Sequence, residues 1–381
     1  MEFAFTDEQQ MIRDTAESFL TDVSTSEAIR AAMATEAGYD ADLWQRICTE
    51  LYFQAVTIPE DFGGMGLGFV ELVAVMEQMG RFLLCAPYFS TVCMASTALL
   101  LAANEEQQAE YFGKILEGGT ATLAFTANGQ WNANGVQATY KATDGGFELN
   151  GSYRYVIDGH TADTLIVAAR AEGTAGAEGI ALFVLPADTA GIERTWLPTM
   201  DQTRKQAQIE LNNVSVGAAA LMAENAADTL AKILDLATIC LAAEQMGGAQ
   251  QVLDITIAYT KERVQFNRPI ASFQSVKHKA ADMMTKVEAC RSGVYYAACI
   301  AQEVLVNGPL AGELAEAASI VKANASDAYF QNAGDGIQLH GGVGFTWEYD
   351  VHMYFKRAKA TEHFLGNAAY HRERLASILL D

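Results

Sequence analysis

Apolar side chains recur at intervals of three and four through the first 118 residues, the spacing of an amphipathic α-helix. The run "LVAVMEQMGRFLL" (residues 72–84) is typical of this pattern. Thr6, followed three residues later by Gln9, predicts a capping box at the start of the first helix. The segment "PEDFGGMGLG" (59–68) carries four glycines and predicts a loop. We expect an N-terminal helical domain over residues 1–118.

The pattern changes near Thr120 to short, often alternating runs that are bounded by Gly, Asn and Asp. The stretch "ATDGGFELNGSYRYV" (142–156) predicts a β-hairpin, since two alternating runs flank an Asp-Gly-Gly turn. These runs predict a middle β-domain over residues 119–222.

Helical periodicity returns at Ala227 and continues to the end of the chain. We expect helices over residues 227–266, 275–306 and 311–335, with a last helix after "HGGVGFTWEYD". These predict a C-terminal four-helix bundle over residues 223–381. The order of helices, then strands, then helices predicts an α+β fold with a β-barrel-like middle domain, and it argues against a doubly wound sheet.

The formal charge is 25 − 47 = −22. So acidic a surface repels nucleic acid and anionic lipid, and we therefore expect neither as a partner. Half of the residues are apolar, which is enough for a large core, and 381 residues predict two or three packed units. A local cluster of arginine and lysine can still bind an anionic small molecule.

Six cysteines are scattered without a CxxC pair and predict reduced core residues of a cytoplasmic protein. The N-terminus is acidic where a signal peptide would be basic. Residues 82–104 carry no charge, but they contain Pro87 and lack flanking positive residues. We therefore interpret them as buried helices and not as a membrane span.

The segment "KERVQFNRPIASFQ" (261–274) is the first candidate for ligand binding. The guanidinium of Arg263 presents a planar set of donors suited to a pair of phosphate oxygens. Phe266 adds an aromatic ring and Gln274 an amide. The alternative is a solvated helix end with a surface arginine.

The second candidate is "GIQLHGGVGFTWEYD" (336–350). Gly341, Gly342 and Gly344 allow close backbone approach, and their N–H groups can face a pyrophosphate. A helix C-cap followed by a turn is the alternative, but it explains one or two glycines better than three beside Gln338 and His340.

Together the two segments, "PEDFGGMGLG" and the helix–sheet–helix order resemble the acyl-CoA dehydrogenase family over almost the whole chain. The resemblance implies the fold of that family, FAD as cofactor, an acyl-CoA substrate, an electron-transfer flavoprotein as acceptor, and a tetramer built as a dimer of dimers. It also implies a set of residues that hold the adenine-diphosphate part of a neighbouring subunit's FAD: Arg263, Gln265, Phe266, Gln274, Gln338, Leu339, His340, Gly341 and Gly342.

The family reaction removes two hydrogens from the acyl chain, and a glutamate takes the α-proton. The two places where the family carries this glutamate correspond here to Leu365 and Ala237. Two other carboxylates are nearby: Glu244 lies seven residues after Ala237, and Glu362 lies three before Leu365. Both are weak candidates for the base, because a structural ion pair at Glu244 and a solvated side chain at Glu362 explain them better.

The segments that cover the flavin ring in the family also differ. Tyr155 stands where the family usually has a tryptophan, and Ile157 replaces a hydrogen-bonding threonine. Since the elements that reach a neighbour's FAD are intact, the chain resembles the non-base-bearing subunit of heteromeric acyl-CoA dehydrogenases that act on steroid side chains and other bulky acyl groups. The "MEF" start and the "KATEHFLG" ending (359–366) share this resemblance.

Three hypotheses follow. In the first, the chain is one subunit of an α2β2 enzyme whose partner supplies the catalytic glutamate. In the second, it is a self-sufficient homotetramer that uses Glu244 or Glu362 as the base. In the third, it is a scaffold that binds flavin or acyl-CoA without turnover.

Overall fold

The computed structural model describes residues 5–380. The "MEF" start lies outside the described residues. The chain forms two compact units. The first, called the helical unit below, contains residues up to Arg30, Phe69–Leu84 and the chain from Thr238 onward, and the second, called the sheet unit, contains Ala31–Gly68 and Cys85–Ala237. The division into three domains at residues 118 and 222 remains a prediction.

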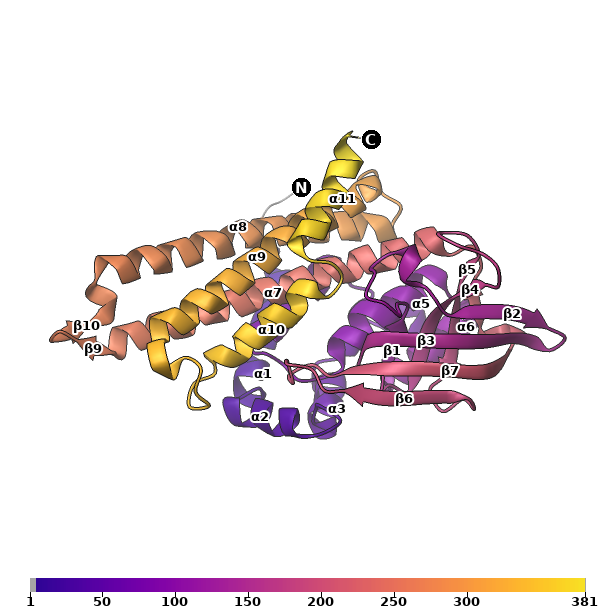
Figure 1. Cartoon of the computed structure of the whole chain (residues 1–381), viewed down its shortest axis with the longest axis horizontal. Coiled ribbons are helices and arrows are strands. Elements are labelled where there is room, and N and C mark those ends of the chain that lie inside the picture. Colours follow the sequence, from indigo (N-terminus) through magenta and orange to yellow (C-terminus); the bar gives the residue numbers. More distant parts are fainter. Residues whose placement is uncertain (1–4, 381) are drawn as a thin grey trace. The chain divides into compact units, whose positions relative to one another are not determined.

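The α-helices carry the labels of Figure 1. Their bounds are α1 (Asp7–Val23), α2 (Ser26–Ala34), α3 (Ala41–Glu50), α4 (Phe69–Arg81), α5 (Thr97–Ala102), α6 (Glu105–Leu116), α7 (Ala227–Glu262), α8 (Gln274–Leu305), α9 (Leu314–His340), α10 (Val351–His363) and α11 (Ala368–Leu380). A π-helix, η3 (Phe89–Ser96), precedes α5. Residues 82–104, expected as buried helices, lie mostly in these two segments and are mostly buried. No helix in the described part of the chain is long and apolar enough to cross a membrane.

Eight strands form the main sheet, in the order β6-β7-β3-β2-β4-β5-β8 with β1 beside β4. Their bounds are β1 (Ala121–Ala124), β2 (Thr139–Thr143), β3 (Gly146–Ile157), β4 (Thr164–Ala171), β5 (Ile180–Pro186), β6 (Ile192–Leu197), β7 (Gln206–Gly217) and β8 (Leu221–Ala223). Alternate residues such as Leu165, Val167 and Ala169 of β4 enter one hydrophobic core, which explains the alternating pattern. The predicted hairpin is confirmed, since β2 and β3 pair antiparallel.

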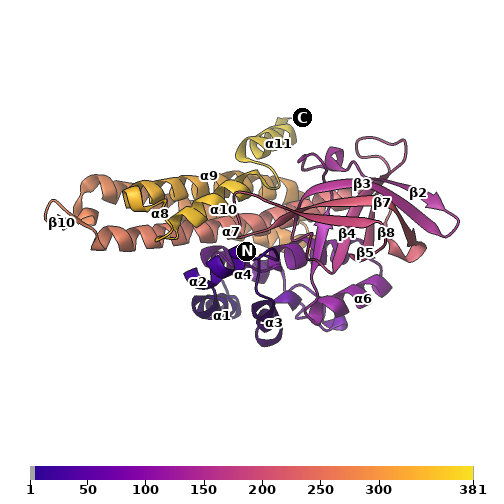
Figure 2. The same cartoon turned by 60° about the horizontal axis from the view of Figure 1, so that its bottom comes forward.

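In the helical unit, α8, α9, α10 and the part of α7 after Thr238 lie side by side (Figure 2). The predicted α+β fold is confirmed. The capping box is confirmed too, because the Thr6 hydroxyl accepts from the Gln9 N–H while the Gln9 side chain accepts from the Thr6 N–H. The six cysteines are free thiols; five are buried, as expected of core residues, whereas Cys299 is half-buried.

Two helix boundaries differ from the prediction. The helix predicted to reach Phe266 ends at Glu262, and residues 264–269 form a hairpin of β9 (Val264–Gln265) and β10 (Arg268–Pro269). The helix predicted to end at residue 335 continues to His340. Gly336 does not end it, because this glycine allows close packing: a Cβ there would lie 2.8 Å from the Val252 side chain.

Candidate functional site

The hairpin after α7 presents an exposed aromatic side chain. In its ladder Gln265 pairs with Arg268 and Val264 with Pro269, so Phe266 and Asn267 form the turn. Phe266 has a φ of 53° and is 87% exposed. A positive φ is costly for a bulky residue, and a strained residue of this kind is a reason to look for function.

Two arginines on this hairpin are available to bind an anion. Neither Arg263 nor Arg268 forms an ion pair or a side-chain hydrogen bond with any residue in the described range 5–380. The Arg268 guanidinium lies 4.0 Å from the centroid of the Phe273 ring. Other arginines of the same unit pair with carboxylates: Arg13, Arg30, Arg81, Arg291, Arg357 and Arg372.

The glycine bend after α9 leaves open space beside the backbone. Gly341 has a φ of 66°, which favours glycine. Gly342 has no such φ, and a Cβ added there would meet no atom within 4 Å. Gly344 differs, because its Cβ would lie 2.7 Å from the carbonyl oxygen of Ile337. The described chain gives no steric reason for glycine at 342, which therefore suits the approach of another molecule.

A stacked pair of rings joins the two segments. The rings of Tyr259 and His340 lie 4.3 Å apart at an interplanar angle of 20°. The Tyr259 hydroxyl also donates to the carbonyl oxygen of His340 at 3.3 Å. Arg263 follows Tyr259 by one helical turn, so the hairpin and the glycine bend lie at the same end of this unit. In Figure 1 this is the end where α7 connects to α8 and α9 connects to α10.

Of the predicted nucleotide-contacting residues, His340 alone is buried. Its Nδ1 lies 2.7 Å from the carbonyl oxygen of Gly336, and burial lowers its pKa. The buried side chain of His340 therefore holds the α9 end in place. Gln265, Gln274 and Gln338 are exposed, and Leu339 is half-buried.

The first candidate base, Glu244, lies inside the helical unit. Its Oε1 accepts a hydrogen bond from Nη1 of Arg357 at 2.8 Å, and the two side chains are 2% and 3% exposed. The neighbouring backbone leaves no space, since a Cβ on Gly80 would lie 2.0 Å from the carbonyl oxygen of Glu244. This geometry favours a structural ion pair over a base that meets a substrate.

The second candidate, Glu362, pairs with Lys359 at 2.8 Å on α10. The turn that follows contains Leu365, which is buried and has a φ of 58°. Ala237, at the other place where the family carries its glutamate, is also buried. Neither position offers a titratable group.

A buried lysine, Lys322, holds the turn after α10 through hydrogen bonds. Nζ of Lys322 donates to the carbonyl oxygens of Thr361, Glu362 and Gly366 at 3.0, 3.1 and 2.8 Å. Burial lowers the pKa of Lys322 to about 7, although Glu362 and Asp327 act in the opposite direction. Lys322 thereby satisfies carbonyl groups at a helix end that water cannot reach.

In the sheet unit, Tyr155 is 39% exposed and has a φ of 62°. Its ring lies beside Gly129, where an added Cβ would be 3.5 Å away. Ile157 is buried, and its carbonyl oxygen accepts a hydrogen bond from the Thr122 hydroxyl at 2.7 Å. The side chain at 157 can offer a flavin no hydrogen bond.

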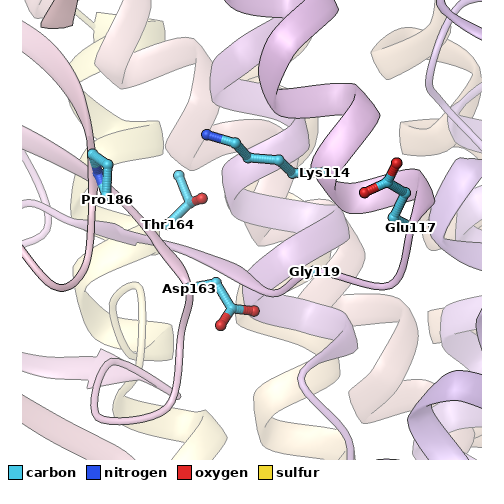
Figure 3. A pocket seen from close by; sticks show the side chains of 6 residues that line it. All are labelled: Lys114, Glu117, Gly119, Asp163, Thr164 and Pro186. Atoms are coloured by element: carbon cyan, nitrogen blue, oxygen red, sulfur yellow. The ribbon is translucent and has the colours of Figure 1, made fainter.

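A hollow of about 370 Å³ in the sheet unit holds none of the predicted residues (Figure 3). It is lined by Lys114, Glu117, Gly119, Asp163, Thr164 and Pro186. Two of its three charged groups already have partners: Lys114 pairs with Glu110 at 2.6 Å, and the Asp163 carboxylate accepts from the Thr120 N–H at 2.8 Å. We assign no ligand to it.

Comparisons with known proteins agree with this geometry. A model of the acyl-CoA dehydrogenase N-terminal domain matches residues 6–119, and a model of the C-terminal domain matches residues 215–380. The acyl-CoA dehydrogenase IpdE2 of Mycobacterium tuberculosis is 33% identical over 97% of this chain and 97% of its own length. The chain belongs to the acyl-CoA dehydrogenase family. It is accordingly an oxidoreductase that acts on acyl-CoA, with FAD as cofactor.

Two solved structures are also similar. A chain of the ChsE4–ChsE5 complex of Mycobacterium tuberculosis is 28% identical with a TM-score of 0.88, over 100% of this chain and 99% of that one. A chain of the Tcur3481–Tcur3483 steroid acyl-CoA dehydrogenase is 29% identical with a TM-score of 0.85, over 98% of both chains.

The residues at the hairpin end fit the nucleotide half of FAD. Two guanidinium groups without an ion-pair partner among the described residues suit a diphosphate, the open backbone at Gly342 suits close approach, and the exposed Phe266 offers a surface to a flat base.

Sequence reasoning missed Arg268 and Lys322. Arg268 lies in the segment 261–274, before a proline and five residues before Phe273. This spacing does not indicate that the side chains of Arg268 and Phe273 stack in the folded hairpin. Lys322 stands in the apolar run "AASIVKANAS" (317–326), where a lone lysine is the available signal of a buried charge.

Proposed function

We propose that this chain takes part in the FAD-dependent α,β-dehydrogenation of an acyl-CoA thioester as one subunit of a heteromeric enzyme, whose partner chain supplies the catalytic glutamate. One observation carries the proposal: the hairpin end is open, while Leu365 and Ala237 replace the base and Glu244 is held by Arg357. A site assembled from two chains needs the base only once.

In this assignment the chain binds and orients the cofactor. Arg263 contacts the diphosphate through charge-assisted hydrogen bonds, and Gly341 and Gly342 allow the backbone to approach it. Phe266 packs on the adenine, with Gln265, Gln274, Gln338 and Leu339 around it. When bound, FAD supplies the acceptor for the hydride that leaves the β-carbon.

The partner and substrate follow from similarity. Likeness to a chain of the ChsE4–ChsE5 complex supports pairing with a second acyl-CoA dehydrogenase chain, in an α2β2 tetramer. Likeness to a steroid acyl-CoA dehydrogenase supports a bulky acyl group. We propose an electron-transfer flavoprotein as the electron acceptor; a solved structure described as an electron-transferring flavoprotein is 29% identical.

Co-expression tests the proposal. The gene is expressed alone and together with a neighbouring gene for a base-bearing acyl-CoA dehydrogenase chain, and dehydrogenation of acyl-CoA thioesters is measured with an artificial electron acceptor. We expect activity only from the co-purified complex. Full activity of the chain alone would contradict the proposal and favour the homotetramer, and bound flavin without turnover in either preparation would favour the scaffold.

The homotetramer makes a separate prediction about the two carboxylates. If Glu244 or Glu362 were the base, Glu244→Gln or Glu362→Gln would lower kcat by several orders of magnitude. Under our proposal, kcat per folded complex stays within a few fold for both variants. The fraction of folded protein is measured alongside, because Glu244→Gln leaves the buried Arg357 without its carboxylate.

A further inference from the structure

A second arginine on the hairpin, Arg268, has a defined orientation. It stands on β10 directly opposite Gln265 of β9, and its guanidinium lies 4.0 Å from the centroid of the Phe273 ring. Phe273 in turn meets Phe266 edge-on, with ring centroids 6.1 Å apart and an interplanar angle of 83°. The side chains of Phe266, Phe273 and Arg268 therefore form one continuous surface.

We propose that Arg268, stacked on Phe273, is a second phosphate-binding residue for an adenosine diphosphate group held at the hairpin end. The inference rests on the proposed function and adds to it a contact that Arg263 alone does not provide. An adenosine diphosphate group occurs in both FAD and coenzyme A, and this chemistry is what the surface recognises.

Local charge supports an anionic ligand. Residues 261–286 contain six lysines and arginines against two carboxylates, in a chain whose net charge is −22. The positive residues are Lys261, Arg263, Arg268, Lys277, Lys279 and Lys286. One of them, Lys279, is neutralised by Asp335, whereas Arg268 meets no carboxylate in residues 5–380.

The stacking explains why an arginine suits this position. A guanidinium that lies on an aromatic ring keeps its N–H edge free to bind two phosphate oxygens. The hairpin also ties Arg268 to Arg263, because the N–H of Ile270 donates to the carbonyl oxygen of Arg263 at 2.8 Å. Two arginines on a hairpin that is closed by this hydrogen bond can bind one diphosphate with little loss of side-chain entropy.

The strained turn agrees with this role. Phe266 and Asn267 both have a positive φ, 53° and 62°. Such a turn suits the right-handed twist of a two-residue hairpin, but Asn-Gly would form it at less cost. A phenylalanine at 266 places an exposed ring near Arg263 and Arg268. A ligand that carries a flat base next to a diphosphate can stack its base on this ring while the arginines bind its phosphates.

The experiment uses the complete complex with its partner chain. Arg268→Ala, Arg268→Lys and Phe273→Leu are compared with Arg372→Ala, which removes the same charge from an exposed position on α11, outside the positive segment 261–286. Two quantities are measured: the dissociation constant of FAD after reconstitution, and the dissociation constant of coenzyme A for the FAD-loaded complex, by calorimetry.

We expect Arg268→Ala to weaken binding of one of the two ligands by about 10- to 100-fold, as loss of a charge-assisted hydrogen bond does. Arg268→Lys should recover only part of the affinity, and Arg372→Ala should change neither value. Weaker FAD identifies the cofactor as the ligand, and weaker coenzyme A identifies the substrate carrier. Unchanged affinity for both overturns the inference.

Arg263→Ala separates this inference from the proposed function. If Arg263→Ala weakens FAD while Arg268→Ala changes nothing, only the role of Arg268 is wrong. If neither variant has an effect, the cofactor assignment of the whole hairpin is wrong. A variant complex that no longer assembles at saturating FAD also overturns the inference, because Arg268 would then contact the partner chain.

Discussion

The interior of the helical unit and its hairpin end use the same residue types for opposite purposes. In the interior, a Cβ on Gly247 would lie 1.8 Å from the carbonyl oxygen of Glu77, so glycine is needed for two helices to touch. At the hairpin end, Gly342 has nothing within 4 Å. Arg357 is buried against Glu244 in the first region, whereas Arg263 is exposed without a carboxylate from residues 5–380 in the second.

This difference in packing separates residues that stabilise the fold from residues that are available to bind another molecule. A glycine or arginine whose role is complete within the chain stabilises the fold, and removing it costs stability. A glycine or arginine with no role inside the chain should affect binding and leave stability unchanged. The following four predictions test this distinction, from the largest expected effect to the smallest.

Glu244→Ala should destabilise the chain by about 3–5 kcal/mol, because it leaves the guanidinium of Arg357 buried without its carboxylate. The measurement is the free energy of unfolding in urea. Glu362→Ala is the control, since the half-exposed pair of Glu362 with Lys359 is worth no more than about 1 kcal/mol. Equal effects of the two variants would show that the interior pair is not special.

Arg263→Ala should weaken FAD binding to the complex by about 1.5–3 kcal/mol, the value of a hydrogen bond to a charged group. The unfolding midpoint of the chain without FAD should not change. Arg372→Ala, which removes an exposed arginine paired with Asp327 in the same unit, is the control and should leave flavin content intact. Flavin retained at the wild-type level after dialysis would contradict the prediction for Arg263.

Gly247→Ala should destabilise the chain by about 1–3 kcal/mol, since the new methyl group forces the backbones of α4 and α7 apart. Gly342→Ala is the matched variant and should leave the unfolding midpoint unchanged. Both are compared by thermal unfolding without FAD. A large loss of stability in Gly342→Ala would mean that the bend is packed more tightly than its geometry indicates.

Lys322→Met should change the pH dependence of stability. The folded-state pKa of Lys322, about 7, lies below its ordinary value of 10.5, so the unfolded chain binds more protons between these pH values. The wild type should therefore gain stability over Lys322→Met as pH rises from 7 to 9, by at most about 1.4 kcal/mol per pH unit. Urea unfolding at several pH values measures the gain, with Lys359→Met, at a half-exposed lysine of α10, as control. Equal slopes for the wild type and Lys322→Met would refute the prediction.

Local patterns in the sequence were sufficient for the architecture. Helical spacing, the alternating runs and the Thr6–Gln9 capping box each depend on neighbours within a few residues, and the structure confirms all three. The two boundary errors have a common cause. The hairpin at 264–269 and the passage of α9 through Gly336 depend on contacts that short-range patterns do not contain.

The candidate site was predictable only in part. The exposed Phe266 and the open Gly342 stand in motifs that the sequence displays, so the amino-acid pattern alone is enough to select these two segments. The partner of Glu244 could not be predicted, because Arg357 lies 113 residues away. The roles of Gly80 and Gly247 were equally hidden, since each is defined by the backbone of another helix.

The exposed hairpin also provides a way to follow assembly. Lys261 lies in the last turn of α7 and Arg263 directly follows the helix; both are exposed at a helix end, where trypsin cuts readily, whereas Pro269 protects the bond after Arg268. In the isolated chain, brief digestion should split the polypeptide between α7 and α8 into two fragments. Under the proposed function, a second subunit and its bound nucleotide cover this segment and make both bonds inaccessible, so the fraction of chain left uncut would report how much of the protein is assembled.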